Sequence, residues 1–203
     1  MKNFIVSSRL FFDKYNNLST SYDMDVLSFL KKLNINIVPH MLNESKQIQK
    51  IKNTDGLILL GGGDIYKNRK TKENEIRDKI EKQLFKLFYE SNKPILAICR
   101  GFQLIMDIYK IKLIKKNGHV RQNHNLTINN SKFISQKKIR VNSFHEYCIE
   151  KIPENYKIVS KASDNTIEIA EHKNKKILCL MFHPERKMAS KEILMKSIKQ
   201  FVK

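Results

Sequence analysis

A single cysteine stands at the break between two apolar runs in the stretch KPILAICRGFQLIMD, residues 93–107. The first run is typical of a buried strand and the second of a helix, so Cys99 is predicted to lie on a sharp strand-to-helix turn. Such a turn pushes the thiol out of the sheet, and the adjacent helix N-terminus favours the nucleophilic thiolate. The backbone N–H of Arg100 then points to where an oxyanion would form, and Gly101 lets the turn be tight. A buried cysteine that only fills the core would fit this segment nearly as well.

A catalytic thiol needs a base, and His183 is placed to serve as one. It follows the apolar run KILCLMF and immediately precedes Pro184 and Glu185. Glu185 is close enough in sequence to turn back and hydrogen-bond the second imidazole nitrogen, as the orienting carboxylate of a triad does. We therefore expect Cys99, His183 and Glu185 to act together, provided that the fold brings their segments to one place.

The order of predicted elements offers a scaffold that would do so. Apolar or β-branched runs predict strands over 3–8, 35–40, 55–60, 93–99, 138–144, 156–163, 166–172 and 176–183. Helical periodicity predicts helices over 21–33, 75–90, 102–109 and 191–202, with a polar surface loop over 66–74. In the first helix the expected buried stripe is Met24, Leu27, Leu30 and Leu33.

The strands of the first half are continuously apolar and alternate with helices. This pattern predicts an α/β fold: an open, mostly parallel, flavodoxin-like sheet with helices on both faces. Ligands of such sheets bind outside the carboxyl ends of the strands. Both Cys99 and the glycine run Gly61–Gly63 would lie there. The length and the lack of a Pro/Ser/Gly-rich linker suggest one domain over 1–203.

Composition restricts the classes of function. The net charge of +19 invites an anionic partner, but the lysines are scattered, so ordinary solvated faces explain most of them. No nucleic-acid motif is visible, and we expect neither nucleic acid nor membrane as a partner. The start MKNFIVSSRLFF is typical of a first strand rather than a signal peptide, which favours a cytoplasmic protein. Three cysteines without CxxC spacing argue against a disulfide scaffold.

Other residues with chemical potential have ordinary interpretations. Cys148 and Cys179 are expected in the core. No metal is expected, because the spacing of His40, His119, His124 and His172 matches no zinc pattern. Asp64 is expected to brace the glycine turn, while Arg77 and Asp78 are expected to be a surface or loop-bracing pair.

The segments GLILLGGGDI, RDKIE, KPILAICRGFQLI, RVNSFHEY and MFHPE follow one another in an order that resembles the class I glutamine amidotransferase superfamily, in its gamma-glutamyl hydrolase branch. The resemblance implies a Cys99–His183–Glu185 triad and no cofactor. The implied oxyanion and substrate contacts come from Gly61, Gly62, Gly63, Arg100, Gln103, His145, Glu146 and Tyr147. The branch often has a His and a Gln where this chain has Glu146 and Tyr147.

The implied activity is hydrolysis of a gamma-glutamyl amide through a glutamyl-thioester. The loop 110–121, unusually basic with Lys115, Lys116 and Arg121, fits an anionic, nucleotide-linked small-molecule substrate. Two enzymatic alternatives remain: a glutaminase subunit that docks on a partner synthetase, and a hydrolase of another gamma-glutamyl amine. A non-catalytic basic binding module is the remaining alternative, although it leaves the ordered triad unexplained.

Overall fold

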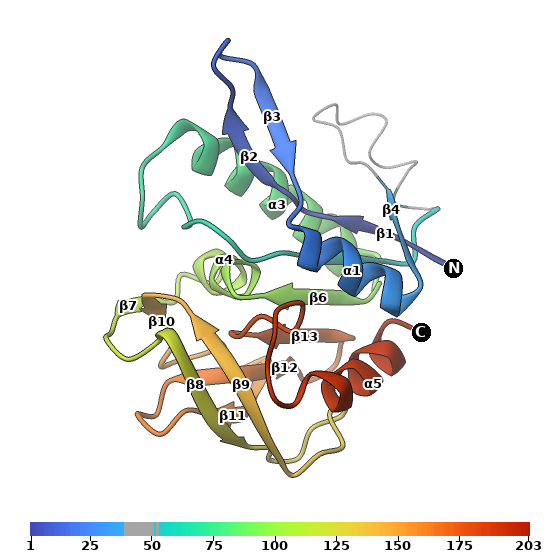
Figure 1. Ribbon diagram of the computed structural model, residues 1–203, viewed down its shortest axis with the longest axis vertical. Coiled ribbons are helices and arrows are strands. Elements are labelled where there is room, and N and C mark those ends of the chain that lie inside the picture. The colour runs from blue at the N-terminus through green and yellow to red at the C-terminus, as the bar shows by residue number, and fades with distance from the viewer. Residues whose placement is uncertain (39–50, 52) are drawn as a thin grey trace.

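A computed structural model describes residues 1–38, 51 and 53–203 (Figure 1). Its strands are β1 (Lys2–Val6), β2 (Arg9–Phe12), β3 (Leu18–Ser21), β4 (Ile35–Val38), β5 (Gly56–Leu59), β6 (Ile95–Ile98), β7 (Ile114–Lys115), β8 (Val120–Thr127), β9 (Lys138–Phe144), β10 (Tyr147–Cys148), β11 (Tyr156–Lys161), β12 (Ile167–His172) and β13 (Ile177–Leu180). The helices are α1 (Met24–Leu33), α3 (Lys72–Glu90), α4 (Arg100–Ile108) and α5 (Lys191–Phe201). His40 and Pro39, at the end of the second predicted strand, lie outside the described residues.

Seven strands form the central sheet, in the order β11-β12-β13-β6-β5-β1-β4. All neighbours from β13 to β4 are parallel, while β11 and β12 complete one edge in antiparallel pairing. The predicted mostly parallel sheet is therefore confirmed. Because β5, β6 and β13 run in the same direction, the segments that follow them emerge at one rim.

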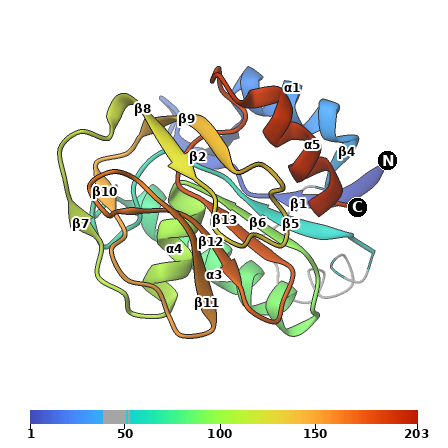
Figure 2. The same cartoon turned by 90° about the horizontal axis from the view of Figure 1, so that it is seen from below.

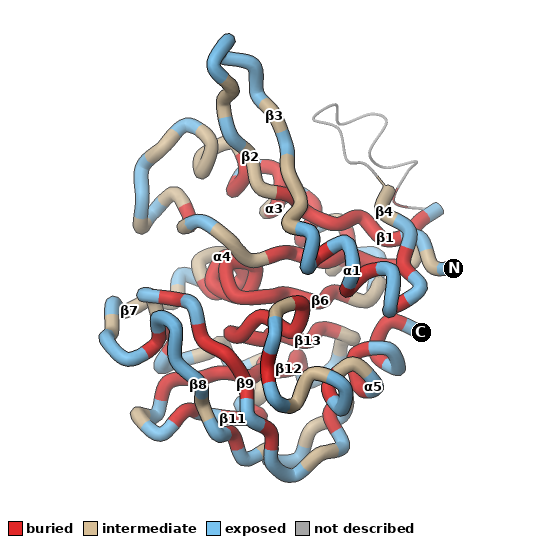
Figure 3. Tube along the Cα trace, in the orientation of Figure 1, coloured by how far each residue is buried: buried red, intermediate tan, exposed pale blue. Residues whose placement is uncertain are grey.

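Helices cover both faces of the sheet, as expected. Helices α1 and α5 lie together on one face, and α3 and α4 lie on the other (Figure 2). The central strands are buried along their length between these layers (Figure 3). Continuous apolar strands are required here because neither face of the sheet meets water. No helix within the described residues is long and apolar enough to cross a bilayer.

The expected stripe of α1 is wrong in half of its members. Met24 and Leu27 are 77% and 38% exposed, whereas the buried face consists of Val26, Phe29, Leu30 and Leu33. Steps of three residues drift by about 60° each around a helix of 3.6 residues per turn, so a stripe built only from such steps winds off the core. The 3-4 spacing of the observed set stays on one face.

A two-stranded ribbon, β8–β9, lies over the end of the sheet that carries β11 and β12 (Figure 1). Lys115 and Ile114 of β7 pair with Tyr147 and Cys148 of β10 beside it. This arrangement brings the segment after β9 toward the rim where β6 and β13 end. The second half of the chain thus supplies one wall of the region above the sheet.

Candidate functional site

Cys99 lies on the turn that the sequence predicts, between β6 and α4. Its backbone has φ 48° and ψ −101°, a conformation that non-glycine residues rarely adopt and that costs free energy. The turn is possible only with glycine at position 101, since a Cβ there would lie 2.5 Å from the carbonyl oxygen of Leu59. The close packing of α4 on β5 therefore fixes the thiol at the helix N-terminus.

His183 and Glu185 follow β13 at the same rim. The imidazole Nδ1 donates to Glu185 Oε1 at 2.6 Å, and both side chains are buried. Burial by itself would lower the pKa of His183, but the neighbouring Cys99 sulfur and the Glu185 carboxylate outweigh it and raise the pKa to about 10. The ring is therefore cationic at neutral pH and placed beside the sulfur.

The backbone of His183 is held by Asn142, a residue that no sequence motif singled out for this role. Asn142, on β9, accepts from the His183 N–H at 2.9 Å and donates to the His183 carbonyl at 2.9 Å. This paired contact locks the segment after β13 to the β8–β9 ribbon. An asparagine within an apolar strand pattern was the available signal, because a buried amide requires partners.

Gly61 lies against both Cys99 and His183. A Cβ built on it would be 2.4 Å from His183 Cε1 and 3.3 Å from Cys99 Cβ. The glycine after β5, the thiol after β6 and the imidazole after β13 thus meet at one point, although their segments are up to 122 positions apart (183 − 61).

A Gly61→Ala substitution is expected to lower the rate of any reaction that depends on Cys99 and His183 about 100-fold, because displacing a catalytic group by 1 Å costs roughly that factor. The methyl group has no room beside the imidazole, so His183 must shift. Steady-state kinetics on the purified variant, with thermal unfolding to confirm that it folds, would measure the effect. An unchanged rate in a folded variant would show that the imidazole position does not matter.

The glycine turn is braced from below by Arg77, which was expected in a surface or loop-bracing pair. The bracing role agrees with the structure, as its contacts show. The surface position is wrong, because Arg77 is buried. Its guanidinium donates to the carbonyls of Gly62 at 2.6 Å and Leu60 at 3.1 Å. In a trans peptide the N–H points opposite to the C=O, so the N–H groups of Gly61 and Gly63 face away from Arg77.

Asp78 is also buried, and it belongs to an ion network under the active turn. The Arg100 side chain, 0% exposed, contacts both Asp78 and Glu81, and Glu81 also accepts from Arg77 Nε at 2.8 Å. Burial raises the pKa of Asp78, with Arg100 opposing it. Burial acts on Glu81 in the same direction, but Arg100 and Arg77 outweigh it and lower its pKa. Arg100 Nε donates to the Asp64 carbonyl at 3.0 Å, so Asp64 does help to brace the turn through its backbone.

A pocket of about 540 Å³ opens above Cys99. It is lined by Arg9, Gly62, Gly63, Asp64, Asn68, Arg69, Cys99, Gln103, Lys115, Phe144, His145, Glu146, Tyr147, His183 and Arg186. The volume suits a ligand of metabolite size. The thiol, the imidazole and most of the residues expected to contact substrate therefore share one cavity.

The residues expected to contact substrate differ in whether their polar groups are already occupied by contacts within the protein. Gln103 donates to the Tyr147 carbonyl at 3.0 Å, which joins two of them. Glu146 is exposed and pairs with Lys115 at 2.9 Å. The His145 N–H already donates to the His119 carbonyl, and its ring Nε2 faces Glu168 at 3.5 Å. The carbonyls of Glu146 and Tyr147 already accept hydrogen bonds, from the Lys116 N–H and from Gln103.

The basic loop 110–121 contributes less to the pocket than its composition suggests. From this loop, Lys115 is among the residues that line the pocket. Lys116 instead pairs with Asp164 and Glu150. His119 is buried. The other cations of the pocket are Arg9, Arg69 and Arg186. Sequence reasoning missed these three because charge alone does not show that an arginine points into a pocket, although Arg186 directly follows Glu185.

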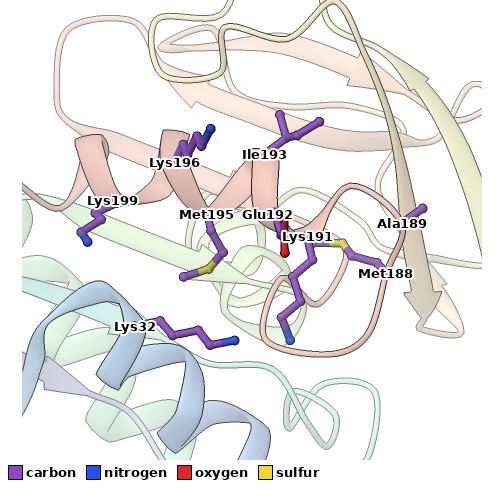
Figure 4. Close-up of a pocket in the computed structure, with 9 residues that line it drawn as sticks. All are labelled: Lys32, Met188, Ala189, Lys191, Glu192, Ile193, Met195, Lys196 and Lys199. Carbon is purple, nitrogen blue, oxygen red and sulfur yellow. The ribbon is translucent and has the colours of Figure 1, made fainter.

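Cys148 and Cys179 are buried, as expected. Burial raises the pKa of the Cys148 thiol to about 12, so it stays protonated. A larger hollow of about 760 Å³ lies between α1 and α5 and is lined mainly by lysine and methionine side chains, with Glu192 among them (Figure 4). The lining residues include no thiol or imidazole, so the smaller pocket over Cys99 is the candidate site.

Comparison with known proteins gives consistent matches. A model of the Peptidase C26 family matches residues 24–185. The gamma-glutamyl-CDP-amidate hydrolase of Campylobacter jejuni is 35% identical over 130 residues, covering 64% of this chain and 62% of that protein. This chain thus spans less than two thirds of that relative's length. A GMP synthase (glutamine-hydrolyzing) subunit from Methanosphaera stadtmanae is 27% identical over 169 residues, 81% of this chain and 83% of that protein.

A solved structure shares the fold over the whole chain. PurLQS from Thermotoga maritima superposes with a TM-score of 0.73 at 20% identity, covering 100% of each chain. At this identity the likeness concerns the fold alone.

Proposed function

Because the chain belongs to the Peptidase C26 family of class I glutamine amidotransferase-like hydrolases, we propose that it cleaves a gamma-glutamyl amide bond with Cys99, His183 and Glu185 as its catalytic triad. The observation that carries this proposal is the convergence of a thiol on a strained turn with a carboxylate-bound imidazole, at the floor of one pocket. Nucleophile, base and orienting carboxylate are the parts that covalent catalysis by a thiol requires.

In the proposed reaction the Cys99 thiolate attacks the gamma-carbonyl carbon and forms a tetrahedral intermediate. The C–N bond then breaks, and the His183 imidazolium gives its proton to the departing nitrogen. A glutamyl-thioester on Cys99 remains. Neutral His183 next takes a proton from water, the resulting hydroxide equivalent attacks the thioester carbonyl, and glutamate leaves as the thiolate is restored.

The oxyanion of the tetrahedral intermediate needs donors that are fixed before the reaction. We propose the N–H groups of the glycine turn, Gly61–Gly63, together with that of Arg100. Arg77 supports this role, since its grip on the Leu60 and Gly62 carbonyls turns the following N–H groups to the opposite side. One such preorganised donor is worth about 3–4 kcal/mol of transition-state stabilisation.

A Glu185→Gln substitution is expected to move the alkaline limb of the rate profile to lower pH. The active form needs His183 protonated, and the raised pKa of about 10 keeps it so through the neutral range. Removing the carboxylate charge destabilises the imidazolium, so its proton is lost at lower pH. The pH dependence of kcat/KM for both proteins measures this. An alkaline limb unmoved by the substitution would contradict the role of Glu185.

For the leaving group we propose a nucleoside diphosphate-linked amine, with gamma-glutamyl-CDP-amidate as the substrate and cytidine diphosphoramidate for capsular polysaccharide modification as the product. Two observations support this choice. The Campylobacter relative carries that activity in its name. The pocket that contains Cys99 is also lined by Arg9, Arg69, Arg186 and Lys115, and guanidinium groups complement phosphate oxygens.

Arg69 is the residue that best separates this substrate from simpler ones. It lines the pocket and has no ion-pair partner among the described residues, unlike Arg9, which pairs with Asp23 at 3.0 Å. We expect Arg69→Gln to raise KM for gamma-glutamyl-CDP-amidate roughly 10-fold or more, as loss of a charged hydrogen bond does. KM for L-glutamine should not change. Arg121 is an exposed arginine outside the pocket, so Arg121→Gln serves as the matched control. If the two variants changed KM equally, the proposed contact between Arg69 and the substrate phosphate would be wrong.

The deciding experiment compares glutamate release from gamma-glutamyl-CDP-amidate, gamma-glutamyl-gamma-aminobutyrate and L-glutamine by the same enzyme preparation. The proposal predicts the highest kcat/KM for the first. Equal rates on all three would be consistent with the proposed amide hydrolysis but would contradict the proposal of a nucleotide-linked substrate. A preference for gamma-glutamyl-gamma-aminobutyrate would indicate a hydrolase of another amine.

A second candidate function is that of a glutaminase which supplies ammonia to a partner synthetase. The observation in its favour is the similarity to the Methanosphaera GMP synthase subunit over 81% of this chain. That function predicts a preference for L-glutamine and low activity of the isolated chain, with stimulation by the synthetase. The same comparison of substrates therefore separates the two functions.

A further inference from the structure

Three histidines and a glutamate converge beneath the β8–β9 ribbon, behind the wall of the pocket. His119 precedes β8 and His124 lies on it, His145 follows β9, and Glu168 lies on β12. His119 Nδ1 is 3.1 Å from His124 Nε2 and 3.6 Å from Glu168 Oε1. His145 Nε2 approaches the same carboxylate oxygen at 3.5 Å. Three segments of the chain thus bring potential ligand atoms together, and His119, His124 and Glu168 offer atoms that all lie within 4.8 Å of one another.

Three polar atoms of this cluster have no hydrogen-bond partner among the described residues. Glu168 is 0% exposed, and among the described residues neither of its carboxylate oxygens has a hydrogen-bond partner. His145 Nε2 is likewise buried and without a hydrogen bond to any described residue. It is costly to bury a carboxylate that has no hydrogen bond or counter-ion. Hydrogen bonds to the described residues do not account for the burial of Glu168.

Hydrogen bonds on the outer side of His119 and His145 determine the tautomer of each ring, and therefore which nitrogen presents a lone pair to the cluster. His119 Nε2 is 2.9 Å from Asp164 Oδ2, and His145 Nδ1 is 3.1 Å from the Tyr147 carbonyl oxygen. Both acceptors require a proton on the nitrogen that they contact. In the neutral rings the opposite nitrogens, His119 Nδ1 and His145 Nε2, then carry lone pairs directed toward Glu168.

A lone pair and a carboxylate that face one another repel, unless a proton or a cation lies between them; between His119 and His124 a hydrogen bond can take that place. Around a tetrahedral zinc ion with bonds of about 2.0–2.1 Å, ligand atoms are about 3.3–3.4 Å apart. Three of the six separations among these four ligand atoms are 3.1, 3.5 and 3.6 Å, and these three bracket that value. Metal-bound histidines also donate their other N–H to a carboxylate or a backbone carbonyl, as His119 and His145 do here.

The geometry points to a closed, structural Zn²⁺ site whose ligands are His119, His124, His145 and Glu168, with Asp164 holding His119 from outside. A set of imidazoles with one carboxylate favours zinc over magnesium or calcium, which prefer oxygen. The divalent charge also offsets the two carboxylates, Glu168 and Asp164.

This proposal departs from the expectation that the histidine spacing excludes a metal. Only His119 and His124 are near each other in sequence, and the other two ligands come from distant segments. His172, which was considered with them, lies elsewhere, 3.3 Å from the Tyr89 hydroxyl. His40 is outside the described residues.

Such an ion would hold the β8–β9 ribbon against β12 and fix the loop 145–147 at the edge of the pocket. Its role would be to stabilise the fold and not to react, since the cluster is buried and its four ligands leave no coordination position open. The prediction concerns zinc content and stability, and is independent of which gamma-glutamyl compound is cleaved.

The test uses the full chain, stripped with a chelator and titrated with Zn²⁺ alone. We expect about one tightly held zinc per chain by elemental analysis and a rise in Tm when zinc is added. His124→Ala is the first variant, because His124 is only half-buried and its loss should not prevent folding. It should lose the zinc-dependent rise in Tm. Asp164→Asn should weaken zinc binding about 10- to 100-fold, as loss of an outer-shell partner does.

His172→Ala is the matched control, a buried histidine outside the cluster that should leave zinc binding unchanged. A folded wild-type chain that retains no zinc and shows no rise in Tm would overturn the proposal, as would His124→Ala binding zinc like the wild type. Cys148 Sγ is 3.6 Å from His145 Nδ1 and could offer a different ligand set. A Co²⁺ derivative with an intense sulfur charge-transfer band would overturn the assignment to nitrogen and oxygen ligands.

Discussion

Replacement of Cys99 by alanine is expected to lower glutamate release by at least about 10⁴-fold, because the thioester can no longer form. The fold should persist, since the Cys99 side chain makes no capping hydrogen bond and alanine occupies less space. Release of glutamate from gamma-glutamyl-CDP-amidate and from L-glutamine should both be lost. Kinetics with purified wild-type and variant proteins, at matched folded concentration, gives the comparison.

Cys179→Ala is the control for this prediction. Cys179 lies one strand away, on β13 opposite Ala97, and is fully buried outside the residues that line the pocket. Its loss should lower stability through the cavity that it leaves, while the rate per folded molecule stays near that of the wild type. A Cys99→Ala variant with substantial turnover would mean that the thiol is not the nucleophile.

Replacement of Arg100 by methionine is expected to lower the free energy of unfolding by about 3–5 kcal/mol, since it strands buried carboxylates without their cation. Arg100 is 0% exposed and contacts both Asp78 and Glu81. For a chain of this length the loss corresponds to a fall in Tm of roughly 6–20 °C. Urea unfolding of the two proteins measures it directly.

Two further variants show whether the loss has the proposed cause. Lys79→Met removes an exposed cation paired with Glu75 at 2.8 Å and should lower the free energy of unfolding far less, because water and salt screen an exposed ion pair. Adding Glu81→Gln to Arg100→Met should recover part of the stability, because it removes a stranded charge. If Arg100→Met were as stable as Lys79→Met, the buried network would not support the fold as described.

Much of the scaffold could be predicted because local pattern and topology agree. Continuous apolar runs indicated strands buried on both faces, and parallel order places the ends of such strands at one rim. That reasoning was enough to expect Cys99 near His183, which the structure places around Gly61. The stripe of α1 was misjudged because three-residue steps alone do not remain on one face of a helix.

The remaining features depend on contacts between distant segments. Arg77, Asp78 and Arg100 are charged, so pattern alone places them at the surface, and only their mutual pairing allows burial. The Glu168 cluster has the same character, since its members are spread from the start of β8 to β12. Arg69 and Arg186 reach the pocket from loops in which nothing in the local sequence fixes their direction.

The most direct test of the thiol's role is peptide mapping by mass spectrometry after acid quench of the enzyme in mid-turnover with a gamma-glutamyl amide. We expect a glutamyl adduct on the peptide that contains Cys99, which disappears on further incubation as glutamate is released. The Cys99→Ala protein should carry no adduct. Turnover in which the adduct never forms, or in which it forms on Cys148 or Cys179, would contradict covalent catalysis by Cys99.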